Sequence, residues 1–111
     1  MTQLRKISKL NTVVYRHPDG TPREVVFHST SVFRAGLPDA MGFREVTLAH
    51  GGWITATTVT RINQALAESG LPYRVSRAGG VMRLYCGGKP PVWGEGGEDR
   101  ITREGTTYRV R

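Results

Sequence analysis

The stretch TTVTRINQALAESGLP, residues 57–72, is the part of the sequence that decides the fold. Its apolar residues recur at helical spacing, which predicts a helix over Thr57–Ser69 with one apolar face. Either of the first two threonines can cap the N-terminus by accepting a free backbone N–H. Gly70 suits the left-handed position after the last turn, and Pro72 prevents the helix from continuing. The expected apolar face consists of Val59, Ile62, Ala65 and Leu66.

Short segments rich in β-forming residues lie on both sides of this helix. Arg44–His50 alternates apolar and polar residues, which predicts a half-buried strand with Val46 and Leu48 on its buried side. Fourteen glycines and six prolines interrupt the chain often, which is typical of short strands joined by tight turns. A further strand is expected at Val13–Tyr15. The segments Glu24–Phe27 and Ser31–Arg34 are expected to form a bent strand or a hairpin about Ser29. Two more hairpins are expected, one of Tyr73–Arg77 with Val81–Cys86 about Ala78-Gly79-Gly80, and one of Ile101–Arg103 with Thr106–Val110.

Together these elements predict an α+β fold class, an antiparallel β-sheet with one main α-helix packed on a face. A length of 111 residues suits a single domain, 1–111, with one modest core. Residues 1–10 and the Gly- and Pro-rich residues 87–98 are expected to be flexible. One cysteine, Cys86, allows no internal disulfide, and neither a signal-peptide core nor a membrane-spanning apolar run is visible. We therefore expect a cytoplasmic protein without a membrane partner.

Positive charge is concentrated toward the two ends of the sequence. Sixteen Lys and Arg oppose nine Asp and Glu, a formal net charge of +7. Residues 1–34 and 71–111 each have a net charge of +4, whereas residues 35–70 have a net charge of −1. A basic face would have to combine both ends of the chain. Such a face favours an anionic partner, and the alternative is a surface whose charge only keeps the protein in solution.

The most distinctive motif is GGWITATT, residues 51–58, which runs into Arg61-Ile62-Asn63. Two glycines allow a sharp turn between strand and helix, and Trp53 is expected to be buried at that corner. The stretch resembles a family of small, mostly uncharacterised proteins encoded by tailed bacteriophages. The resemblance extends to residues 28–32 and 71–75, about half of the chain, although Val59 replaces a frequent lysine and the tail from Gly87 does not match. The resemblance implies a phage accessory protein in the host cytoplasm and implies no reaction.

The turn before the helix is a candidate anion-binding loop. Paired glycines can form a nest of N–H groups, and a helix N-terminus has a positive partial charge. The alternative is that the threonines only cap the helix and close the corner. The candidate residues are Gly51, Gly52, Thr55, Thr57 and Thr58.

Basic residues near both ends are candidate nucleic-acid contacts. Tyr73 and Tyr85 interleave with arginines on the expected hairpin, and Arg83 and Tyr85 can share a face, whereas Arg74 lies opposite Tyr73. This pattern suits a single-stranded or a duplex backbone, and the alternative is a solvated strand face. The candidate phosphate contacts are Arg5, Lys6, Lys9, Arg61, Arg74, Arg77 and Arg83.

Nothing in the sequence indicates catalysis, a metal or a cofactor. The carboxylates are scattered, and the three histidines, His17, His28 and His50, have no ligand spacing. His28 is expected to be a hydrogen-bonded strand residue. The preferred hypothesis is therefore a phage accessory protein that binds nucleic acid through a basic surface. The alternatives are a host-directed inhibitor that binds an acidic protein of a defence or transcription complex, and a minor virion component.

Overall fold

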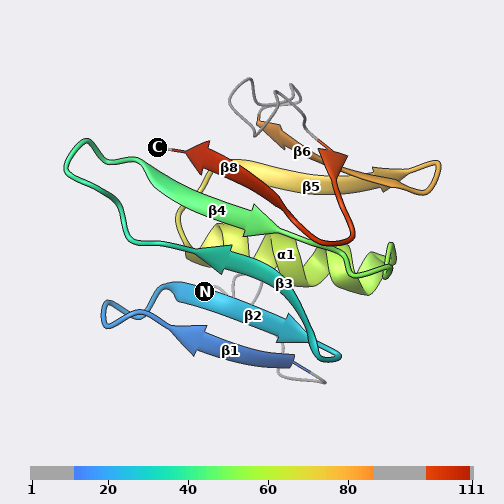
Figure 1. Cartoon of the computed structure of the whole chain (residues 1–111), viewed down its shortest axis with the longest axis horizontal. Helices are drawn as coiled ribbons and strands as arrows, with labels where there is room; N and C mark the ends of the chain where they lie inside the picture. The colour runs from blue at the N-terminus through green and yellow to red at the C-terminus, as the bar shows by residue number, and fades with distance from the viewer. Residues whose placement is uncertain (1–11, 87–99, 111) are drawn as a thin grey trace.

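A computed structural model describes residues 12–86 and 100–110, which form two antiparallel sheets around one helix (Figure 1). The larger sheet has the strand order β1-β2-β3-β4-β8, and the smaller has the order β5-β6-β7. The predicted flexible residues 1–10 and 87–98 lie outside the described residues. The elements are β1 (Thr12–Arg16), β2 (Pro22–Phe27), β3 (Thr30–Ala35), β4 (Arg44–Leu48), α1 (Ala56–Glu68), β5 (Tyr73–Ala78), β6 (Val81–Cys86), β7 (Arg100–Ile101) and β8 (Thr106–Val110).

The predicted α+β class, with antiparallel strands and one helix packed on them, is confirmed. Helix α1 contacts β2, β3 and β5, and it lies behind the five-stranded sheet in Figure 1. The sequence suggests a single sheet, but the structure divides the strands between two. The predicted hairpin of Ile101–Arg103 with Thr106–Val110 is wrong, because β7 pairs with β6 and β8 pairs with β4. The chain thus crosses from one sheet to the other between β7 and β8.

The ends of α1 follow the local sequence, with one correction. The N-cap is Thr55 rather than Thr57 or Thr58: its side chain accepts the Thr58 N–H, with 3.3 Å between Oγ1 and N. At the other end, Gly70 has a φ of +71°, and the Leu71 N–H donates to the Leu66 carbonyl. This is the 6→1 bond of the expected Schellman cap.

One hydrophobic core joins the inner faces of both sheets to the helix. In β4, Val46 and Leu48 are buried and Glu45 is exposed, as the alternation predicts. The other end of the chain returns to the same core, where Tyr108 of β8 is fully buried. The smaller sheet adds Tyr73, Val75, Met82, Leu84 and Ile101.

Candidate nucleic-acid interface

The outer side of the three-stranded sheet collects arginines from all three of its strands. Arg74 of β5 lies opposite Tyr85 of β6, and Arg83 of β6 lies between Ser76 of β5 and Arg100 of β7. Residues directly opposite one another in an antiparallel pair extend to the same side of the sheet. The intervening residues of these strands are buried in the core, so this side faces away from it. We call it the arginine face: Arg74, Ser76, Arg83, Tyr85 and Arg100.

The arginine face is small, and the charged side chains among its five members are all arginines. Adjacent strands are separated by about 4.8 Å, so the three strands that carry its arginines span about 10 Å. β5, β6 and β7 contain no Asp or Glu. Arg83 and Arg100 lie directly opposite each other, so both side chains can contact the same phosphate.

The structure separates the predicted basic residues rather than gathering all of them. Arg74 and Arg83 share the arginine face, whereas Arg77 lies opposite Met82 and therefore extends to the other side of the sheet. The predicted contacts Arg5, Lys6 and Lys9 lie outside the described residues. The sequence reasoning missed Arg100, because it paired the chain around Ile101 with residues 106–110 instead of with Val81–Cys86.

Arg61 is a buried structural residue and not a surface contact. Only 7% of it is exposed. Its Nε–H donates to Thr12 Oγ1 at 3.1 Å, and its guanidinium carbon lies 5.5 Å from the centre of the Phe27 ring. A phosphate would have no access to this group, so Arg61 is not part of the candidate interface.

The predicted anion-binding loop uses its amides inside the protein. The N–H of Gly51 donates to the Arg103 carbonyl, and the N–H groups of Gly52 and Trp53 donate to Nδ1 and the carbonyl of His50. Hydrogen bonding to a ring nitrogen requires that nitrogen to be unprotonated. The pKa of His50 is lowered, mainly by burial of the ring and also by the positive charge of Arg103. The negative charge of Glu104 acts in the opposite direction.

The threonines of the same motif also act within the fold. Thr55 caps the helix, Thr58 is fully buried, and their hydroxyl oxygens lie 3.1 Å apart. Thr57 is exposed. The arrangement matches the capping alternative, because the amides of Gly51 and Gly52 and the hydroxyl of Thr55 form hydrogen bonds within the protein.

Asn63, the last residue of the motif, fastens β5 to the helix. Its Nδ2–H donates to the Val75 carbonyl at 2.9 Å, and its Oδ1 accepts the Val75 N–H at 2.6 Å. β5 is an edge strand of the smaller sheet, and Asn63 replaces a neighbouring strand at this position. The motif therefore supports the strand that carries Arg74.

Trp53 and His28 depart from the predictions in a related way. Trp53 was expected in the core, but 47% of it is exposed. His28 was expected within a strand, but it is exposed in the two-residue turn between β2 and β3. The two rings are neighbours, with centroids 5.7 Å apart and planes inclined by 31°. The positive φ angles of Gly51 and Gly52 turn the chain so that residue 53 leaves the core.

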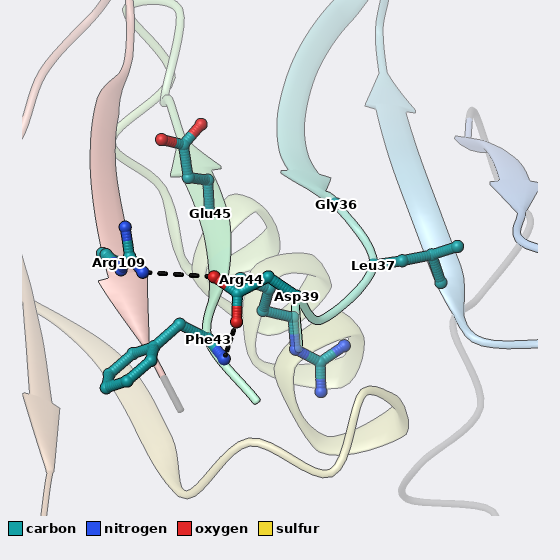
Figure 2. Close-up of a pocket in the computed structure, with 7 residues that line it drawn as sticks. All are labelled: Gly36, Leu37, Asp39, Phe43, Arg44, Glu45 and Arg109. Atoms are coloured by element: carbon teal, nitrogen blue, oxygen red, sulfur yellow. Dashed lines mark hydrogen bonds and ion pairs between the residues drawn. The ribbon is translucent and has the colours of Figure 1, made fainter. Parts of the chain in front are cut away.

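The outer side of the five-stranded sheet has mixed charge, unlike the arginine face. Glu24 lies opposite Arg34, and Glu45 lies opposite Arg109. A depression of about 270 Å³ at the end of this sheet shows the same balance (Figure 2). In it, Asp39 accepts an N–H of Arg109 at 3.1 Å.

The Asp39 carboxylate of this depression is held by several donors besides Arg109. The Asp39 carboxylate also accepts the backbone N–H groups of Phe43 and, with a smaller effect, Met41, and these bonds lower the pKa of Asp39. The Arg109 guanidinium carbon lies 4.9 Å from the centre of the Phe43 ring. This carboxylate closes the β3–β4 loop and would repel a phosphate, so the depression is a poor anion site.

The described residues contain no cluster of three or more His, Cys, Asp or Glu side chains that could hold a metal ion. Within residues 12–86 and 100–110, no helix has the length and apolar character to cross a membrane. No family description, curated protein or solved structure matches the chain.

Proposed function

We propose that this protein binds single-stranded nucleic acid through the arginine face. The observation that carries the proposal is the presence of three arginines and Tyr85 on one side of a sheet whose strands contain no carboxylate. Arginine forms bidentate bonds with phosphate, and an aromatic ring on a sheet surface can stack on an unpaired base. The motif of residues 51–58, which we call the corner motif, resembles proteins of tailed phages. This resemblance supports the proposal that the protein is a phage accessory protein.

The choice of a single strand follows from the shape of the surface. Tyr85 belongs to a strand of the sheet and not to a projecting helix or loop. A base must be unpaired to lie on such a ring, whereas a duplex keeps its bases stacked inside the helix. The three surrounding arginines can then hold the phosphates on either side of the stacked base.

Binding should weaken with salt in proportion to the phosphates contacted. For single strands, each contact contributes about 0.7 to the slope of log K against log salt concentration. Three arginine contacts predict a slope of about −2, which is about a 20-fold loss of affinity between about 50 and 200 mM salt. Fluorescence anisotropy with a labelled oligothymidylate measures this slope, and a duplex of equal length is the competitor.

Two results would overturn the proposal. No binding at about 50 mM salt would exclude a phosphate-driven interface. Stronger binding to the duplex than to the single strand would exclude the role given to Tyr85. An acidic host protein is the competing partner, and it would be retained in stoichiometric amount from a nuclease-treated lysate.

A further inference from the structure

The second aromatic surface of the molecule is the ring pair of Trp53 and His28. Trp53 is 47% exposed, although a tryptophan in a small domain is usually largely buried. Its ring plane is inclined by 31° to that of His28. The His28 ring in turn lies beside that of Phe27, with 4.3 Å between their centroids and 56° between their planes. The buried Phe27 thus supports a short row of tilted aromatic rings that ends at the surface.

The backbone holds His28 in an unfavourable conformation. His28 and Ser29 have φ angles of +50° and +66°, a region that residues other than glycine adopt rarely because it is sterically unfavourable. The β5–β6 hairpin turns on Gly79 and Gly80, which take the same region without this steric conflict. A strained His-Ser turn beside an exposed tryptophan indicates that the position of the ring has a use beyond folding.

The loop that carries Trp53 is fixed before any ligand arrives. Its three successive amides, at Gly51, Gly52 and Trp53, all donate hydrogen bonds within the protein. A surface that is already ordered loses little entropy on binding.

Arg103 links this aromatic pair to the arginine face. Its guanidinium carbon lies 3.7 Å from the point where a Cβ atom at residue 52 would lie. Arg103 is therefore beside the loop that carries Trp53. Arg100 of the arginine face is three residues earlier in the chain, at most about 11 Å away. Figure 1 shows the β2–β3 turn, the β4–α1 loop and the β7–β8 loop at one end of the molecule.

We infer that Trp53 and His28 form a second stacking platform for the same nucleic-acid strand, which reaches it from the arginine face past Arg103. This inference rests on the proposed function and extends it. The platform binds a nucleobase against the Trp53 ring, and Arg103 contacts the phosphate between the two stacking positions. A short strand occupies only the arginine face, whereas a longer strand also reaches the platform.

The test compares oligothymidylates of about 4 and about 16 nucleotides, the range of site sizes for compact single-strand binders. Trp53→Ala should lower the affinity for the longer strand by about 5- to 150-fold, the loss expected for one stacked base, and leave the affinity for the shorter strand unchanged. Trp53→Phe, which keeps an aromatic face, should retain most of the affinity. Trp93 is the second tryptophan of the sequence and would otherwise contribute to the fluorescence. In a Trp93→Phe background, the fluorescence of Trp53 should be quenched by the longer strand only.

A second variant separates a binding role from a structural one. The double change His28→Asn and Ser29→Gly supplies the residues preferred in this turn, so the melting temperature should rise. The same change removes the His28 ring, so the affinity for the longer strand should fall. A merely structural turn would give the rise in stability without the loss of affinity.

The two levels of the proposal fail in different ways. If the wild-type protein binds both strands and all platform variants bind them equally well, the platform is excluded and the arginine face is retained. If the wild-type protein binds neither strand at low salt, the proposed function and the platform are excluded together.

Discussion

Replacing Asn63 by alanine should release β5 from the helix. The substitution removes both hydrogen bonds to Val75, a residue that is only 3% exposed. An unpaired buried backbone group costs about 1–3 kcal/mol, so two of them cost about 2–6 kcal/mol. Because Asn63 itself is only partly buried, water can reach the vacated position, and we expect a loss in the lower half of this range, about 2–4 kcal/mol.

Urea unfolding followed by circular dichroism measures this loss. With an m-value of about 2 kcal/mol/M, the midpoint should fall by about 1–2 M. Thr57→Ala, at an exposed position of the same helix, is the control and should change the free energy of unfolding by less than about 0.5 kcal/mol. A loss for Asn63→Ala as small as that of the control would refute the structural role of the motif. The placement of Arg74 would then need another explanation.

Three further results are expected. Arg61→Met should lower the free energy of unfolding by about 2–4 kcal/mol, because it removes the hydrogen bond to Thr12 and the cation–π contact with Phe27. The affinity for nucleic acid should not change, and a reduced affinity in a fully folded variant would contradict the burial of Arg61. Because the pKa of His50 is lowered, the unfolded chain takes up its proton first as the pH falls, so the free energy of unfolding should decrease from pH about 7 toward about 5.5. His50→Gln should remove that part of the dependence, and a variant profile identical to that of the wild-type protein would contradict the lowered pKa of His50. Tyr85→Ala should lower affinity for single strands by about 5-fold or more while Tyr85→Phe retains it, and equal losses in the two variants would contradict stacking.

Local features of the sequence were sufficient to predict most elements. The helix, its Schellman cap at Gly70 and the β5–β6 hairpin depend on residues close together in the chain, and all are confirmed. Of the two alternatives for residues 24–34, a bent strand or a hairpin, the structure shows the hairpin. The pairing of Met82 with Ile101 joins residues far apart in the sequence, and no local pattern encodes it. For this reason the division into two sheets, and the contribution of Arg100 to the arginine face, could not be predicted.

The errors around the corner motif have separate physical causes. Arg61 lies one helical turn from Thr58 and from Ala65, both of which are buried. The helical period therefore places Arg61 on the buried face, but its charge led to the prediction of a surface contact. For Trp53 no such signal exists. A turn with two glycines can direct the next side chain to either side, and hydrophobicity alone favours the core.

The central claim is that one side of the smaller sheet, and not net charge, determines binding. Arg74 and Arg77 belong to the same strand and are both exposed, but they extend to opposite sides. Arg74→Gln and Arg77→Gln therefore remove the same charge from nearly the same place. The affinity of each variant for one labelled oligothymidylate is measured at several salt concentrations. Arg74→Gln should lower the affinity and reduce the magnitude of the slope of log K against log salt concentration by about 0.7, whereas Arg77→Gln should leave this slope unchanged. Equal effects of the two variants would contradict the account.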